Sequence, residues 1–471
     1  MKGALPVDLV EREFEGCELG DPRRSRRLVE IARKAALDPS ASFPTMCGKD
    51  INRMYEFLGN EHVDSEGILE AHFDQTRQRC TQAADVYVLH DSTDFEFPGE
   101  GRTGLGPISG GGATGFLGHF ALAVSSTGCP LGVLGFHPWV RAARKAKKKK
   151  DWLKRYKDPN KESVRWVNMI QTVEDRMRGT GKSLIHVADR ESDDYALISN
   201  VMQASQRIVI RIRADRTLAS EEGAEPGKLF STMDALDGVM TREVPISKRG
   251  VQNRGPKALR SHPVRNARVA TLQFSATSVT LKRPHGIGTD LPAALVVNVV
   301  RVFEPDPPDG EAAVEWRLMT TEPITTADDV ARIVDIYRMR WLIEEFFKAL
   351  KTGCQVESRQ LESGHGLINA VALLVPLAYL LLLLRATARA TPDADAKTAL
   401  SVTQLKVLDA VADPPLPPHP TVRHAMYAIA ALAGHLKRNG DPGWRLLGEG
   451  YQRLLVLEQG WAARDRQQRS R

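Results

Sequence analysis

Hydrophobic and polar positions in the first 82 residues follow the spacing of helices, and turn residues mark the ends. Asp21-Pro22 precedes an arginine-rich amphipathic run, which predicts a helix with Asp21 as N-cap and Pro22 at its first position. Gly59-Asn60 is a typical helix stop. Three helices are predicted: from Pro22 to Asp38, through Tyr55 and Phe57 to Gly59, and over residues 68–79. Residues 1–82 are therefore expected to form a helical domain.

From residue 83 the pattern changes to short apolar runs that are typical of buried strands. The run at 86–89 leads through His90 to Asp91 at its end, and the run at 184–188 ends at Asp189. Further strands are predicted at 119–124, 131–136 and 208–212, with a helix at 163–177. Strands that alternate with helices indicate an α/β domain.

Residues 214–313 differ from their neighbours because they are rich in glycine, proline and short β-type runs, such as 269–274 and 294–302. We expect a β-rich insertion here. A strand at 316–319 then precedes a long helix, for which Thr326 is the N-cap and Asp329 completes a capping box. This helix is expected to run to Lys351 and to stop at Gly353.

The composition indicates a folded protein of several domains. The chain has 471 residues, 42% of them hydrophobic and 26% charged, with a net charge of +7. A basic chain is attracted to nucleic acids and to anionic membranes alike. Arginines crowd one short segment, at Arg23, Arg24, Arg26 and Arg27, and lysines and arginines crowd a second, at 141–150. Either run is also compatible with a solvated face.

The five cysteines and one apolar stretch bear on the compartment. The cysteines are scattered, with no CxxC pair, which argues against a disulfide framework and a structural zinc site and fits a reducing cytoplasm. The N-terminus has no signal-peptide pattern. Residues 367–384 are almost wholly apolar and at the lower limit for a membrane span, but Asn369 and Pro376 interrupt them. We expect a buried or partner-facing helix and no membrane partner.

Asp91 and Asp189 are candidate metal ligands. Open α/β sheets bind ligands at the carboxyl ends of their strands, so the two side chains would face one crevice. Two or three converging carboxylates suit Mg²⁺, which prefers hard oxygen ligands. Taken alone, each aspartate is more often a helix cap or a turn residue.

The predicted long helix changes this balance because it carries a polar stripe. At about 100° per residue, one acid, three cations and a phenol share one side of the helix, namely Tyr337, Arg340, Glu344, Lys348 and Lys351. Apolar residues for packing lie opposite, among them Ile336, Leu342, Phe346 and Leu350. Glu344 can complete a metal site while the cations meet phosphate oxygens. The alternative is a solvated face with intrahelical ion pairs.

The stripe also carries a family resemblance. The segment Tyr337-Arg-Met-Arg340-Trp-Leu-Ile-Glu344-Glu-Phe-Phe-Lys-Ala-Leu-Lys351 resembles the Tyr-(2)-Arg-(3)-Glu-(6)-Lys signature of the IS-four family of DDE transposases, in its Tn-five-like branch. The sequences around Asp91 and Asp189 resemble the two aspartate motifs of that family. The segment 20–28 resembles its DNA-binding part, and 432–444 its dimerisation region. Two departures are Phe347, where close relatives often carry histidine, and Glu56, where they often carry arginine.

The resemblance implies a function and a set of site residues. It implies cut-and-paste DNA transposition, with two Mg²⁺ ions, or Mn²⁺ as a substitute, held by Asp91, Asp189 and Glu344. It also implies a hairpin intermediate and a homodimer that bridges two transposon ends. The implied DNA contacts are Tyr337, Arg340, Lys348, Lys351, Arg211, Trp316 and Trp341, together with Arg23, Arg24, Arg26 and Arg27. Trp316 and Trp341 would hold a base out of the stack, although Trp316 also fits an ordinary strand core.

The predicted fold class is α/β, a ribonuclease-H-like core interrupted by a β-rich insertion and flanked by helical domains. The segments are 1–82, which binds DNA ends; 83–213 and 314–385, the two parts of the core; 214–313, the insertion; and 386–471, for dimerisation. Two alternatives remain: a catalytically silent, transposase-derived DNA-binding protein or inhibitor, and a carboxylate-pair hydrolase such as a glycosidase. The hydrolase leaves the cations of the helix without a role.

Overall fold

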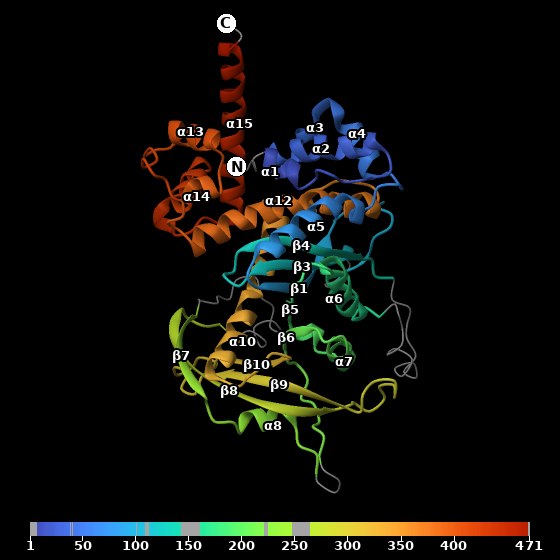
Figure 1. The fold of residues 1–471 in the computed structure, drawn as a ribbon. Coiled ribbons are helices and arrows are strands. Elements are labelled where there is room, and N and C mark those ends of the chain that lie inside the picture. Colours follow the sequence, from blue (N-terminus) through green and yellow to red (C-terminus); the bar gives the residue numbers. More distant parts are fainter. Residues whose placement is uncertain are drawn as a thin grey trace. The chain divides into compact units, whose positions relative to one another are not determined.

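The computed structural model describes residues 7–37, 39, 41–99, 101–108, 113–142, 161–220, 225–246 and 264–469. Most of the second basic run, 143–150, lies outside these residues, as does Asp38. The chain forms two compact units (Figure 1). Unit 1 contains residues 1–146, 171–182 and 341–471, and unit 2 contains 147–170 and 183–340. Both combine helices with strands, which confirms the mixed α/β class. The units cut across the five predicted segments, whose boundaries stay a prediction.

The N-terminal part of unit 1 is helical, as the sequence predicts. Its helices are α1 (Val7–Arg12), α2 (Pro22–Leu37), α3 (Phe43–Cys47), α4 (Ile51–Leu58) and α5 (Ser65–Gln82). Asp21 caps α2 as expected, because its Oδ1 accepts a hydrogen bond from the Arg23 N–H at 2.8 Å. Gly59 follows the last residue of α4, again as expected.

The strands of unit 1 are longer than the apolar runs that predicted them. They are β1 (Val86–Glu96), β2 (Gly106–Pro107), β3 (Thr114–Ser125) and β4 (Pro130–Trp139). β3 pairs antiparallel with β1, β2 and β4. β1 pairs with β3 along its whole length, and Phe95 near its end is buried. Asp91 therefore lies in the middle of the strand. The prediction that Asp91 ends its strand is therefore wrong.

Helix α12 (Gly364–Ala390) contains the apolar stretch, and it is the core of unit 1. It is long and apolar enough to cross a membrane, but 89% of its most apolar window is buried inside the structure. It packs on α4, α5 and β4. Asn369, which interrupts the stretch, is buried and donates to the carbonyl oxygens of Leu58 at 2.9 Å and Val63 at 2.8 Å. The expectation of a buried helix is confirmed. The chain ends in α13 (Val402–Val411), α14 (Val422–Leu432) and α15 (Trp444–Arg469).

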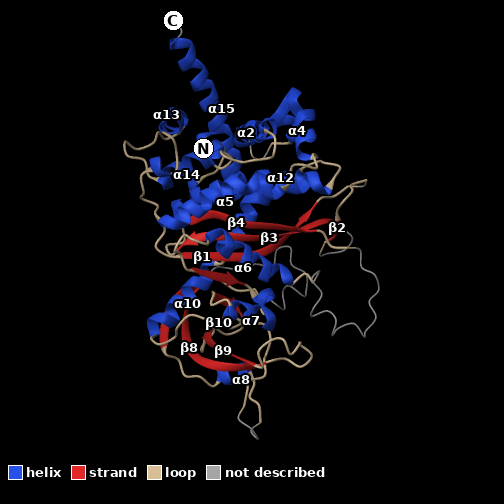
Figure 2. Cartoon of the chain, turned by 45° about the vertical axis from the view of Figure 1, so that its right-hand side comes forward, coloured by secondary structure: helices blue, strands red, loops and turns tan. Residues whose placement is uncertain are grey.

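Unit 2 is built on a mixed sheet (Figure 2). Its strands are β5 (Leu184–Ala188), β6 (Arg207–Arg211), β7 (Met240–Ile246), β8 (Arg268–Lys282), β9 (Ala294–Phe303) and β10 (Glu315–Thr320). Within the unit their order is β5-β6-β10-β9-β8-β7. β5 and β6 are parallel, and the other neighbours are antiparallel. The helices are α6 (Val164–Met177), whose last turns belong to unit 1, α7 (Tyr195–Gln203), α8 (Leu229–Asp234) and α10 (Ala327–Met339).

One hydrophobic cluster links the two predicted segments of unit 2. It joins Ile198 and Ile210, from the first part of the predicted catalytic core, to Leu281 and Val297 of the predicted insertion. The strands of residues 214–313 therefore extend the sheet through the β9–β10 pairing and share its core. The β-rich character expected of this segment is confirmed.

The long helix begins as predicted but does not run unbroken to Lys351. Thr326 and Asp329 form the expected capping box. The helix is then interrupted at Arg340, whose N–H bonds to the Tyr337 carbonyl three residues earlier. It resumes as α11 (Trp341–Lys348) and ends in a π turn, Ala349–Gly353. The prediction of one continuous helix is wrong, because a shift of one hydrogen-bond partner breaks the ladder. The break coincides with the boundary between the units.

Candidate active site

In unit 1, the structure places Asp91 and Glu344 on elements that pack against each other. Phe120 is the cross-strand partner of Asp91, so the two side chains share one face of the sheet. The ring of Phe120 lies 5.5 Å from that of Phe346 and 5.6 Å from that of Phe347, centroid to centroid. Helix α11, which carries Glu344, therefore covers the face from which Asp91 projects. Phe347 fills this contact, which explains an apolar residue at that position.

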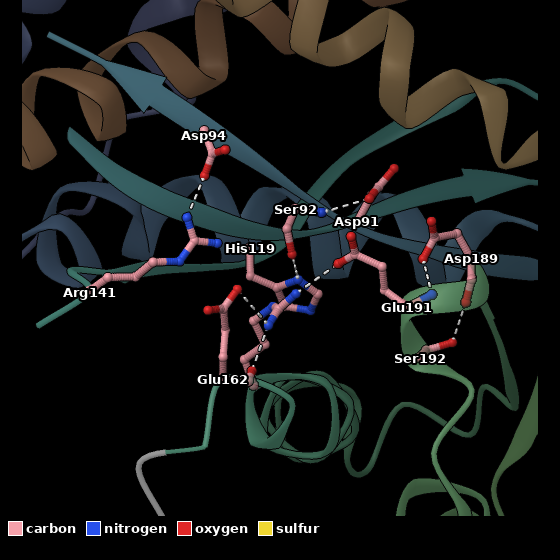
Figure 3. A network of polar contacts seen from close by, with 10 residues as sticks. Asp91, Ser92, Asp94, His119, Arg141, Glu162, Asp189, Glu191 and Ser192 are labelled. Atoms are coloured by element: carbon pink, nitrogen blue, oxygen red, sulfur yellow. Dashed lines mark hydrogen bonds and ion pairs between the residues drawn. The ribbon is translucent and has the colours of Figure 1, made fainter. Parts of the chain in front are cut away.

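Lys351 lies over the same face of β1. Its ammonium group is 5.4 Å from the centre of the Phe95 ring, and Phe95 is four residues from Asp91 on the same side of the strand. It donates to the main-chain oxygen of Asp94 and pairs with Glu357 at 3.1 Å. The Asp94 carboxylate binds Arg141 at 3.1 Å, as Figure 3 shows. Lys351 is thus held at the end of the strand that carries Asp91.

Lys348 belongs to a second network, which the sequence did not predict. It pairs with the buried carboxylate of Glu345 at 2.8 Å, and its ammonium lies 4.6 Å from the centre of the Trp341 ring. Burial opposes ionisation of Glu345, but Lys348, Arg385 and Arg389 outweigh it and lower its pKa. The glutamate–lysine spacing of three residues was the available signal. Trp341 is 52% exposed, which leaves much of its ring accessible to a ligand.

In unit 2, Asp189 follows β5 directly, as predicted, and caps a short turn. Its Oδ1 accepts a hydrogen bond from the Glu191 N–H at 2.8 Å, and its carbonyl accepts one from the Ser192 hydroxyl at 2.6 Å (Figure 3). The turn Arg190–Ser192 comes next. Asp189 is partly exposed at the carboxyl end of a buried strand.

Four of the predicted DNA contacts lie near one another in unit 2. Tyr337 is buried, and its ring meets that of Trp316 edge to face at 6.0 Å. Burial raises the pKa of the Tyr337 hydroxyl, Arg340 and Arg211 act in the opposite direction, and the Asp189 carboxylate raises it again. Arg211 is the cross-strand partner of Leu318 and so shares a sheet face with Trp316. The structure therefore brings Tyr337, Arg340, Arg211 and Trp316 together, and the Asp189 carboxylate is close enough to act on the Tyr337 hydroxyl.

The arginines of α2 are on the surface of unit 1 but are engaged with residues of α2 and of the segment just before it. Arg23 pairs with Asp21 at 2.9 Å, and this hydrogen bonding lowers the pKa of Asp21 to about 2. Arg27 pairs with Glu30 at 3.0 Å, while Arg24 and Arg26 donate to main-chain oxygens. Exposed ion pairs of this kind contribute little to stability, so phosphate can replace the carboxylates at small cost. Their contact with DNA stays a prediction.

The three acids are divided between the units, with Asp91 and Glu344 in unit 1 and Asp189 in unit 2. Within the described part of the chain, no group of three or more histidine, cysteine, aspartate or glutamate side chains is close enough to hold a metal ion. The donor chemistry nevertheless fits Mg²⁺, because all three candidates are carboxylates and two of them lie on elements that pack together.

Comparison with known proteins identifies the family. A family model described as transposase DDE domain matches residues 85–381, and one described as transposase DNA-binding matches residues 7–63. The first match covers more than half of the 471 residues and contains all three candidate acids. The chain belongs to the DDE transposase family. A DDE transposase binds DNA, cleaves it and transfers strands, so the alternative of a carboxylate-pair hydrolase is wrong.

Among solved structures, the chain is similar to a piggyBac transposase in a cryo-EM synaptic complex with hairpin DNA. The identity is 10%, the match covers 84% of this chain and 80% of the other, and the TM-score is 0.33. The family assignment rests on the two sequence matches.

Proposed function

We propose that this DDE transposase performs cut-and-paste transposition of an insertion sequence, with Asp91, Asp189 and Glu344 as its catalytic acids on a ribonuclease-H-like core. The observation that carries the proposal is the placement of Asp91 and Glu344 on one sheet face and the helix that covers it. The acids would hold two Mg²⁺ ions, with Mn²⁺ as a substitute. When bound, such ions supply Lewis-acid stabilisation of the attacking and leaving oxygens in phosphoryl transfer.

The protein's own cations and aromatic rings would bind the DNA. Lys348 and Lys351 in unit 1, and Arg211 and Arg340 in unit 2, are suited to phosphate oxygens beside the acids. Trp316, backed by Tyr337, and the exposed Trp341 offer surfaces on which an unstacked base can rest. This supports a hairpin intermediate, whose formation needs a base out of the stack. Arg23, Arg24, Arg26 and Arg27 would grip the transposon end.

The proposal includes a homodimer on paired ends and a cytoplasmic location on bacterial chromosomal DNA. Exposed apolar side chains on the C-terminal helices, such as Val402 and Val456, support a protein partner there. Recovery of the protein in the membrane fraction would contradict the location.

The decisive experiment is cleavage of DNA that carries the inverted repeats flanking this gene. We expect Mg²⁺-dependent cleavage at the repeat boundary, lost by at least about 100-fold in Glu344→Gln, because the lost metal ligand is worth several kcal/mol of barrier. End binding should be retained. Glu243→Gln is the matched control, since it removes an exposed carboxylate from β7. Binding without cleavage by the intact protein, in Mg²⁺ and in Mn²⁺, would instead establish a catalytically silent DNA-binding relative.

A further inference from the structure

The motif that contains Asp189 ends in a second aspartate, Asp193, for which the proposed function has no use. Its side chain is fully buried, and that of its partner Arg216 is 8% exposed. An ionised carboxylate is stable in such a place only when several donors surround it. We therefore expect Asp193 to have a structural role, and its hydrogen-bond partners indicate which one.

In the described part of the chain, Asp193 accepts hydrogen bonds from the segment 213–216. Its Oδ2 accepts hydrogen bonds from the N–H groups of Arg213 at 2.7 Å and Ala214 at 2.8 Å. Its Oδ1 pairs with the Arg216 guanidinium, which also donates to the main-chain oxygen of Asp193 at 2.9 Å. The carboxylate thus fastens the end of the 190–192 turn to the segment that follows β6.

This fastening acts on two site residues at once. Asp189 begins the turn that Asp193 ends, and its carbonyl accepts from the Ser192 N–H at 3.1 Å. Arg211 is the last residue of β6, only two positions before Arg213. The pair of Asp193 and Arg216 therefore connects the turn that begins at Asp189 to the segment that follows Arg211.

We propose that Asp193, paired with Arg216, is a positioning residue that fixes Asp189 for metal binding and Arg211 for DNA. The inference rests on the proposed role of Asp189. Groups that orient a ligand commonly change metal affinity by about 10- to 100-fold when they are replaced. Asp193→Asn has nearly the same shape, but its amide cannot accept from both main-chain N–H groups while pairing with Arg216. The turn at 190–192 can then change its conformation, and the position of Asp189 changes with it.

The test compares full-length Asp193→Asn with Asp194→Asn on end DNA. Asp194 is the neighbouring carboxylate; it caps α7 through the Ala196 N–H, pairs with Lys161 at 3.1 Å, and asparagine caps helices equally well. We expect Mn²⁺ binding to the protein–DNA complex, followed by electron paramagnetic resonance, to weaken about 10- to 100-fold in Asp193→Asn only. The Mg²⁺ concentration for half-maximal cleavage should rise in parallel, and excess Mg²⁺ should restore the rate.

Two outcomes distinguish a failure of this inference from a failure of the proposed function on which it rests. If Asp189→Asn abolishes cleavage while Asp193→Asn binds Mn²⁺ like the control, the positioning role is refuted. If Asp189→Asn itself still cleaves, the proposed role of Asp189 fails instead.

Arg216→Lys keeps the proposal testable if Asp193→Asn does not fold, because it retains a cation and both main-chain bonds. It should weaken Mn²⁺ binding in the same direction by a smaller factor. Unchanged Mn²⁺ binding in a folded Arg216→Lys protein would overturn the inference.

Discussion

At the scale of single residues, Tyr337 combines apolar packing with a polar contact, although a helical wheel assigns it to the polar side alone. The wheel places it on a polar stripe with Glu344, yet its ring is buried against Trp316 and only its hydroxyl reaches polar neighbours. A phenol can do this because it has an apolar body and a polar tip. Removing the hydroxyl alone therefore separates the packing of Tyr337 from its proposed contribution to the site.

Tyr337→Phe should slow strand cleavage by about 10-fold or more, the worth of one hydrogen bond to a charged group. The free energy of unfolding should change by less than about 1.5 kcal/mol, since the ring stays in place. Tyr195→Phe is the matched control, because it loses a hydrogen bond to the Pro292 carbonyl in the same unit. Single-turnover cleavage and chemical denaturation measure the two effects. Cleavage by Tyr337→Phe at the native rate would show that the Tyr337 hydroxyl has no role in the reaction.

At the scale of elements, a buried cluster of Glu13, His72 and Arg79 joins the end of α1 to α5 and β4. Glu13 pairs with His72 and, at 2.7 Å, with Arg79. The other ring nitrogen of His72, Nε2, accepts the N–H of Val133 at 3.0 Å, so His72 is neutral. Arg79 also lies over the Tyr379 ring of α12. This contact attaches the helical N-terminal part to the sheet that carries Asp91.

The cluster predicts that unit 1 loses stability on mild acidification. Burial lowers the pKa of His72 below its ordinary value of 6.5, so the unfolded chain takes up the proton more readily. Stability should be full above pH 6.5 and fall as the pH decreases below it. Burial opposes ionisation of Glu13, but His72 and Arg79 outweigh it and lower its pKa, so its contribution is lost only below pH 4.5.

Thermal unfolding between pH 7.5 and pH 5 measures this effect, in about half-unit steps. The melting temperature of the native protein should fall across this range, and His72→Gln, which cannot titrate, should show a flatter profile. Parallel profiles for the two proteins would show that His72 is not the group responsible.

At the scale of the whole molecule, Asp91 and Glu344 belong to unit 1 and Asp189 belongs to unit 2, so the proposed function needs the full chain. Unit 1 alone takes residues from both ends of the sequence, 1–146 and 341–471. The C-terminal helices that complete it leave Val456 of α15 65% exposed. An exposed apolar side chain on a terminal helix is consistent with the proposed homodimer.

Analytical ultracentrifugation with paired end DNA should therefore detect two chains for two ends. Val456→Lys should weaken this assembly, because a charge in an apolar interface is costly. Val296→Lys is the control, since Val296 is 62% exposed on β9 of unit 2. A native protein that stays monomeric on paired ends would contradict the dimer. Equal effects of the two variants on the assembly would show that the dimer interface does not include Val456 of α15.

The sequence by itself determined most elements, because hydrophobic periodicity and helix capping are local properties. The apolar run at 184–188 predicted β5 and the helix expected at 163–177 is α6, both almost to the residue, and Thr326 with Asp329 predicted the start of α10. The sequence also singled out the candidate acids and cations by their types and spacing, and their roles stay a prediction. What the sequence could not show was how far pairing extends a strand, as in β1 beyond Asp91.

Tertiary structure alone decided the remaining features, because they depend on partners far apart in the chain. The break at Arg340 needs one changed hydrogen bond, which leaves the hydrophobic pattern of the helix unaltered. Glu13 meets His72, and Asp193 meets Arg216, across 59 and 23 residues. A buried charge is specified by the donors around it, and those donors come together only when the chain has folded.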